Sequence, residues 1–135
     1  MFEYITLTQL FNWRFKTIGF ITTGVTAKED VLFIHGFISS SAFWTETVFP
    51  SLSASSSTHR LFAVDLLGFG KSPKPADSLY TLREHVEMIE KSVLHKYNVK
   101  SFHIVAHSLG CILALSLAAR HGGLIKSLTL LAPVS

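Results

Sequence analysis

The sequence predicts an α/β protein built on a doubly wound, mostly parallel sheet. From residue 31 onward, short continuous apolar runs alternate with segments of helical periodicity, which is typical of βαβ units. The chain has 135 residues, of which 48% are hydrophobic and 16% are charged, so it can form one domain with a core. We expect residues 31–135 to form this domain. Residues 1–30 are expected to be a poorly ordered lead-in or an early strand.

Four apolar runs are expected to be strands of this sheet. They lie near residues 31–35, 61–65, 102–107 and 126–132. Each run is short and is bounded by turn-forming residues, as expected of buried parallel strands. Because helices connect these strands, their pairing should be parallel.

Three segments between the strands are expected to be helical, near residues 41–52, 82–96 and 109–120. Thr81 and Glu84 have the spacing of a capping box at the start of the second helix. Gly122 and Gly123 should end the third helix. The serine-rich stretch 51–58 is expected to be a surface loop.

Composition limits the partners and the compartment. The net charge is +3 and the basic residues are scattered, which argues against a nucleic-acid partner. No apolar run is long enough for a stable membrane span. The apolar stretch 17–25 lacks the flanks of a clean signal peptide. The chain has a single cysteine, Cys111, so an intramolecular disulfide is excluded. Cys111 is expected to pack in the core. The sequence does not indicate an oligomeric state.

The segment between the third strand and the third helix carries the strongest chemical signal. It consists of Ala106, His107, Ser108, Leu109 and Gly110. A serine with a small residue two positions before it and another two positions after it is typical of a nucleophile elbow, which is a sharp strand-to-helix turn. We therefore expect a positive φ at Ser108. The alternative is a serine that only caps the helix.

A second signal follows the first strand, where His35, Gly36 and Phe37 form a turn. In elbow-containing folds this position supplies an oxyanion donor. The backbone N–H groups of Phe37 and Leu109 are therefore expected to point at one oxyanion, and His35 is expected to be a structural turn residue.

The stretch 65–72 resembles a phosphate-binding loop because it ends in Gly-Lys-Ser. Asp65 stands where such a loop requires glycine, and Pro73 and Pro75 block the helix that should follow. We expect a glycine-rich turn in which Asp65 makes structural hydrogen bonds. Nucleotide binding is the disfavoured alternative.

Together, these motifs resemble the α/β-hydrolase superfamily over residues 31–135. The amino-acid sequence of residues 35–47, 65–75 and 104–113 resembles that of the plant BODYGUARD proteins. The resemblance implies a lysophospholipase-like serine hydrolase of lipid-like carboxylic esters, with Ser108 as nucleophile. It also implies a role in cuticle formation, an extracellular location in the epidermal wall, and no metal or cofactor.

In this superfamily the catalytic acid and histidine follow later strands, and none of the seven histidines fits that pattern. His121, for example, ends a helix far from Ser108. We therefore expect the chain to be the N-terminal half of a hydrolase domain, inactive on its own, with an apolar edge strand that favours aggregation. The alternative is a non-catalytic binding or regulatory module.

Overall fold

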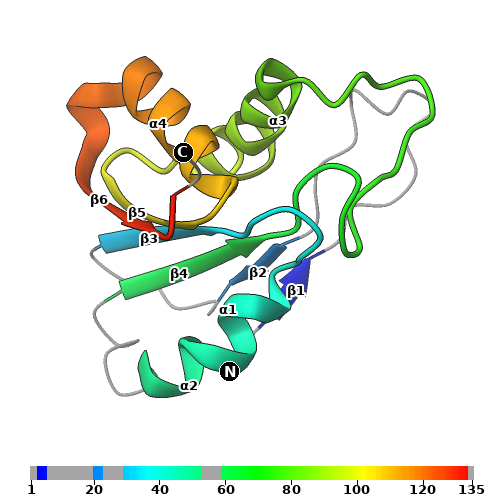
Figure 1. Cartoon of the computed structure of the whole chain (residues 1–135). Coiled ribbons are helices and arrows are strands. Elements are labelled where there is room, and N and C mark those ends of the chain that lie inside the picture. The colour runs from blue at the N-terminus through cyan, green and yellow to red at the C-terminus, as the bar shows by residue number, and fades with distance from the viewer. Residues whose placement is uncertain (1–2, 6–19, 23–28, 53–58, 134–135) are drawn as a thin grey trace.

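The computed structural model describes residues 3–5, 20–22, 29–52 and 59–133. Six strands form one sheet in the order β1-β2-β4-β3-β5-β6 (Figure 1). They are β1 (Glu3–Ile5), β2 (Phe20–Thr22), β3 (Glu29–Ile34), β4 (His59–Val64), β5 (Phe102–His107) and β6 (Ile125–Leu131). The four strands expected from the sequence are all present, and β3 begins two residues earlier than its apolar run.

The pairing of these four strands is parallel, as predicted. Strand β3 lies between β4 and β5, and β5 also pairs with β6. The two short strands from the first 30 residues pair with each other in antiparallel fashion, and β2 is antiparallel to β4. The sheet is therefore mostly parallel with an antiparallel margin. Most of the apolar stretch considered as a signal peptide (17–19 and 23–25) and most of the expected surface loop (53–58) lie outside the described residues.

Helices cover both faces of the sheet (Figure 1). On one face lie α1 (Ala42–Thr47) and α2 (Phe49–Leu52), which together replace the single helix expected there. On the other face lie α3 (Leu82–Ile89), which continues as a π-helical segment (Glu90–His95), and α4 (Gly110–His121). This two-sided cover makes the sheet doubly wound.

The alternation of side chains along each strand divides the core into two clusters. On the α3 and α4 side, Leu32 and Ile34 pack with Ile104 and Leu117. On the α1 and α2 side, Phe33 packs with Trp44 and other buried side chains. Because β3 is buried on both faces, its sequence is a continuous apolar run rather than an alternating one.

The start of α3 shows how sequence fixes a helix boundary. The Glu84 N–H donates to the Thr81 hydroxyl oxygen at 3.1 Å, which is one half of the expected capping box. The Glu84 carboxylate accepts from the Ser78 hydroxyl. The helix therefore begins at a fixed residue and brings its apolar face onto the sheet. None of the helices in the described part of the chain is both long and apolar enough to cross a membrane.

Candidate active site

Ser108 occupies the sharp turn between β5 and α4. Its φ is 55°, in the left-handed region, as the sequence predicted. A serine held there costs about 1–3 kcal/mol, so the surrounding structure must enforce this backbone. The Ser108 N–H donates to the Leu131 carbonyl at the end of β6, at 2.9 Å. The turn is thus fastened to a neighbouring strand, and the side chain remains half-buried rather than enclosed.

The residues around this turn are small because backbones meet there. A Cβ atom at Gly110 would lie 2.6 Å from the His35 carbonyl oxygen and 2.7 Å from that of Ile34. A Cβ atom at Gly36 would lie 3.0 Å from the Cβ of Ser108. Ala106 is completely buried at the end of β5. The turn after β3 and the turn after β5 are therefore in direct contact.

His35 holds the first of these turns through both ring nitrogens. Its Nε2 accepts from the Leu66 N–H at 3.0 Å, so Nδ1 carries the proton and donates to the Gly36 carbonyl at 2.7 Å. Burial lowers the pKa of His35, although the Gly36 carbonyl and the Asp65 carboxylate oppose this shift. A buried, neutral imidazole in these bonds positions backbone and has no nitrogen left for proton transfer.

The glycine-rich turn after β4 is built around the Asp65 carboxylate. One carboxylate oxygen accepts from the Ser41 N–H at 2.7 Å, and the other accepts from the Lys71 N–H at 3.1 Å. The Ser72 hydroxyl donates to the Asp65 carbonyl. Amides that would face a phosphate in a nucleotide-binding loop are thus turned toward a carboxylate of the protein itself. This geometry matches the structural role expected for Asp65.

The backbone amides of Phe37 and Leu109 are available to a ligand. Neither N–H donates a hydrogen bond to another residue in the described part of the chain. Both residues line a single pocket of about 270 Å³. Leu109 precedes the first turn of α4, where N–H groups have no partner within the helix and attract negative charge.

The pocket beside Ser108 is mainly apolar. Its lining residues are Gly36, Phe37, Leu66, Phe69, Tyr80, Leu82, His85, Leu109, Ile112 and Leu113. The ring of Phe37 is largely exposed at its rim and lies edge-on to Phe69. Phe43 is not among these lining residues, and its ring stacks on that of His107 with ring centroids 4.6 Å apart. A pocket of this character accommodates a hydrocarbon group.

Sequence reasoning missed His85 and Tyr80 as lining residues of this pocket. The Nδ1 atom of His85 is buried without a hydrogen-bond partner among the described residues, and burial lowers the pKa of its ring. His85 is placed on the same face of α3 as Leu82 and Ile89 by helical spacing. That spacing could have placed His85 on the packed face of α3, but it gives no sign of a pocket.

None of the hydrogen bonds among the described residues joins the Ser108 hydroxyl to a histidine. His121, at the far end of α4, lies 2.6 Å from the Glu90 carboxylate, which also pairs with Arg120. Cys111 is buried near Ser108, and burial raises the pKa of its thiol.

A serine on a strained strand-to-helix turn, at the carboxyl edge of a doubly wound sheet, is the arrangement typical of α/β hydrolases. The chain belongs to the alpha/beta hydrolase fold family, whose sequence model matches residues 31–135.

Comparisons with known proteins confirm the resemblance to the BODYGUARD proteins. The chain is 98% identical over 113 residues to "Probable lysophospholipase BODYGUARD 3" of Arabidopsis thaliana and 72% identical over 108 residues to BODYGUARD 2 of the same plant. These alignments cover 84% and 79% of the chain but 23% of each relative, so the chain spans about a quarter of their length. The solved structure of haloalkane dehalogenase DbeA from Bradyrhizobium elkani matches with a TM-score of 0.83 and 26% identity, covering 99% of this chain and 43% of that one.

Proposed function

We propose that Ser108 is the nucleophile of a serine hydrolase that cleaves carboxylic esters, with lipid-like acyl esters as substrates. The observation that carries this proposal is the left-handed backbone of Ser108 at a half-exposed turn between β5 and α4. A serine that only capped the helix would not need this backbone, because N-cap residues adopt the extended region. The strain is worth maintaining where it lifts a reactive side chain above the sheet.

In the proposed reaction the Ser108 oxygen attacks the acyl carbon, and the ester carbonyl oxygen becomes an oxyanion. The N–H groups of Phe37 and Leu109 stabilise that oxyanion. Both are unpaired within the described structure and line the same pocket. A donor of this kind contributes about 100-fold or more to the rate when it meets the developing charge. The start of α4 adds a favourable dipole.

The apolar pocket supports an acyl chain as the group next to the reacting carbonyl. Phe37, Phe69 and Ile112 present hydrocarbon surface, and no Asp, Glu, Lys or Arg is among the described lining residues. The relatives named as lysophospholipases favour the same substrate class. A role in cuticle formation outside the cell is part of this proposal by similarity to the BODYGUARD proteins.

The catalytic acid and histidine are proposed to come from the region of the relatives that this chain does not span. A triad histidine is needed because a serine hydroxyl without a base is a weak nucleophile. Loss of triad members costs on the order of 10⁴–10⁶ in rate. The 135-residue chain alone is therefore proposed to turn over esters slowly.

The test compares the 135-residue chain with a longer form that carries the remaining carboxyl-terminal region of BODYGUARD 3. Hydrolysis of p-nitrophenyl butyrate and of lysophosphatidylcholine is measured for both, with Ser108→Ala in the longer form as the matched control. The proposal expects turnover by the longer form that Ser108→Ala abolishes. A longer form that binds these lipids without hydrolysing them would instead support a non-catalytic binding module.

A further inference from the structure

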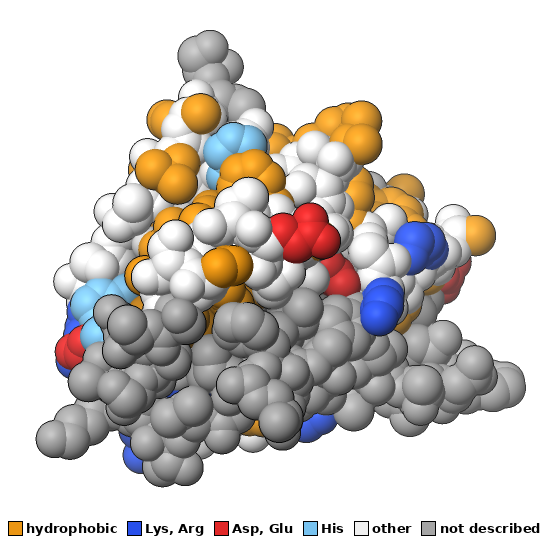
Figure 2. Space-filling model, turned by 90° about the horizontal axis from the view of Figure 1, so that it is seen from below, with side chains coloured by type: hydrophobic (Ala, Val, Ile, Leu, Met, Phe, Trp, Pro, Cys, Tyr) orange, Lys and Arg blue, Asp and Glu red, His pale blue; other side chains and the backbone are white. Residues whose placement is uncertain are grey.

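A second cluster of polar side chains lies at the opposite edge of the sheet from Ser108. Glu29 and His59 are the first residues of β3 and β4, and His103 is the second residue of β5. Along the face that α1 and α2 cover, histidine side chains lie beside acidic and basic ones at one margin (Figure 2). The three strands are neighbours in the sheet, so residues far apart in sequence converge there.

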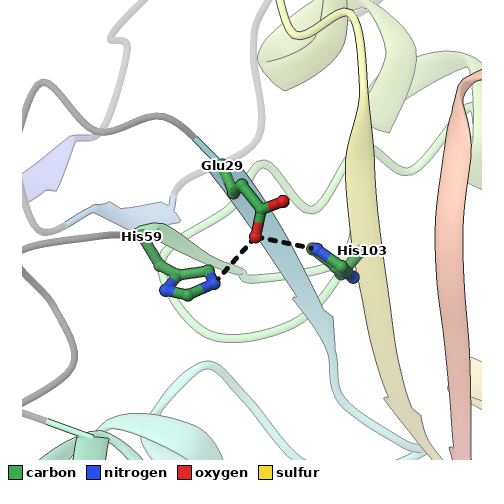
Figure 3. A group of neighbouring side chains, drawn as sticks. All are labelled: Glu29, His59 and His103. Atoms are coloured by element: carbon green, nitrogen blue, oxygen red, sulfur yellow. Dashed lines mark hydrogen bonds and ion pairs between the residues drawn. The ribbon is translucent and has the colours of Figure 1, made fainter.

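The three side chains point toward one another (Figure 3). The Glu29 Oε2 atom lies 3.0 Å from the His59 Nε2 atom and 3.3 Å from the His103 Nε2 atom. Strand register explains this, because Glu29 is paired with His59 and Val31 with His103. Residues two apart on a strand share a face. One carboxylate oxygen therefore faces two imidazole nitrogens.

Two residues of β6 support this arrangement from outside. The Lys126 ammonium donates to Glu29 Oε1 at 2.6 Å, which leaves Oε2 for the imidazoles. Ser127 is the register partner of His103, and its hydroxyl oxygen lies 2.6 Å from His103 Nδ1. A hydroxyl can accept from Nδ1–H, which frees Nε2 as a ligand. Metal-binding histidines are commonly oriented in this way by the other ring nitrogen.

The carboxylate is in its charged, ligating form at neutral pH. Glutamate carboxyl groups ionise well below neutral pH, and the Lys126 ammonium, 2.6 Å from Glu29 Oε1, favours the ionised form. All three side chains are partly exposed, with 25% to 34% of each side chain accessible. They also line one end of a pocket of about 480 Å³ whose other walls include Val31, Phe33 and Leu61. Water can therefore reach the cluster.

The donor set and its spacing match the requirements of Zn²⁺. Zinc takes imidazole nitrogen and carboxylate oxygen at roughly 2.0–2.2 Å in a tetrahedron, which places neighbouring ligand atoms about 3.3 Å apart. The two oxygen-to-nitrogen distances here are 3.0 and 3.3 Å, and the three candidate ligand atoms all lie within 4.8 Å of one another.

We propose that Glu29, His59 and His103 form a zinc-binding site with three protein ligands and a fourth position open to water. Bound Zn²⁺ would tie the first residues of β3, β4 and β5 together. No local sequence motif signals this site, because its ligands come from three separate strands and meet only through the register of the sheet. The site is independent of Ser108 and of the proposed ester chemistry.

The test uses the 135-residue chain without a histidine tag, stripped of metal with EDTA and dialysed. Zn²⁺ is titrated calorimetrically, and Co²⁺ is used as a spectroscopic probe of tetrahedral coordination. Stoichiometric binding of Zn²⁺ is expected, weakened on the order of 100-fold by His59→Gln or His103→Gln. His95→Gln is the matched control, since His95 is exposed on the π-helical segment, and it should leave binding unchanged.

A second kind of variant leaves all three ligands in place, so its effect on Zn²⁺ binding can be read even where a ligand variant does not fold. Ser127→Ala removes only the contact to His103 Nδ1 and should weaken Zn²⁺ binding by about 10-fold, within the range for such supporting residues. Zn²⁺ should also raise the Tm of the wild-type chain but not that of His59→Gln. The proposal is overturned if the wild-type chain binds no stoichiometric Zn²⁺, or if folded His59→Gln and Ser127→Ala bind it as tightly as the wild type does.

Discussion

Gly36 and Ser108, which are far apart in sequence, are so close that a Cβ atom at Gly36 would lie 3.0 Å from the Cβ of Ser108. The two residues follow neighbouring parallel strands, β3 and β5, whose carboxyl ends meet at one edge of the sheet. This contact brings the amide of Phe37 and the amide of Leu109 to the same pocket. The candidate site thus depends on close packing of two backbones.

Replacing Gly110 should show how little room this packing leaves. The added Cβ of Gly110→Ala would lie 2.6 Å from the His35 carbonyl oxygen, which is backbone and cannot move aside cheaply. We expect the free energy of unfolding to fall by about 1–3 kcal/mol, as for other overpacked sites. Urea unfolding followed by circular dichroism measures it. The matched control is Gly123→Ala, whose Cβ meets nothing within 4 Å; an equal loss in both variants would contradict the packing argument.

The strained backbone of Ser108 predicts an unusual gain in stability. Glycine adopts a positive φ without steric cost, so Ser108→Gly should relieve strain at φ 55°. We expect the free energy of unfolding to rise by about 1 kcal/mol while any Ser108-dependent chemistry is lost. Ser108→Ala, which keeps the strain, serves as the comparison. If Ser108→Gly is less stable than Ser108→Ala, the turn is not strained in the way described.

Asp65 should matter for stability because its carboxylate accepts hydrogen bonds from two backbone amides. Asp65→Ala removes the acceptor for the Ser41 and Lys71 N–H groups and leaves the Ser41 amide buried. Hydrogen bonds to a charged acceptor contribute about 1.5–3 kcal/mol each, so we expect a loss of about 2–4 kcal/mol in chemical denaturation. Asp77→Ala, at an exposed position, should change stability by less than about 0.5 kcal/mol. Similar effects of the two variants would argue against this role.

One buried and one partly buried histidine make stability depend on pH. Burial lowers the pKa of His35 and of His85 below the ordinary value of 6.5. The unfolded chain therefore binds protons first as the pH falls, and this stabilisation is present above pH 6.5 and lost progressively below it. Unfolding midpoints at pH 7.5 and 5.5 should show a decrease at the lower pH. His85→Gln should reduce that decrease; a wild-type decrease that His85→Gln leaves unchanged would contradict the assignment for His85.

Local signals made the strands and the two turns predictable from sequence. The run before His35 is apolar throughout because both faces of β3 are buried, and the small residues around Ser108 reflect the lack of space at that turn. Such requirements act within a few residues and leave a readable pattern. The break between α1 and α2 at Val48 lies just before Pro50, which cannot donate a helical hydrogen bond. The π-helical segment after Ile89 leaves no such pattern.

Features that arise from register could not be predicted in the same way. His85 enters the pocket because α3 packs on the sheet, and Glu29 meets His59 because β3 pairs with β4. Neither residue belongs to a motif, since each gains its environment from partners distant in sequence. The strand β2 lies within the apolar stretch 17–25, and an early strand was one of the two expectations for residues 1–30, whereas the three residues of β1 are too few for an apolar run to indicate them.

The most direct test of Ser108 as the nucleophile is covalent labelling with a fluorophosphonate followed by peptide mass spectrometry. The longer form extended with the BODYGUARD 3 region is treated with the probe beside its Ser108→Ala variant. We expect a single phosphonylated peptide that contains Ser108, and no label in the Ser108→Ala protein. An unlabelled wild-type protein, or a label that persists on another residue in Ser108→Ala, would contradict it.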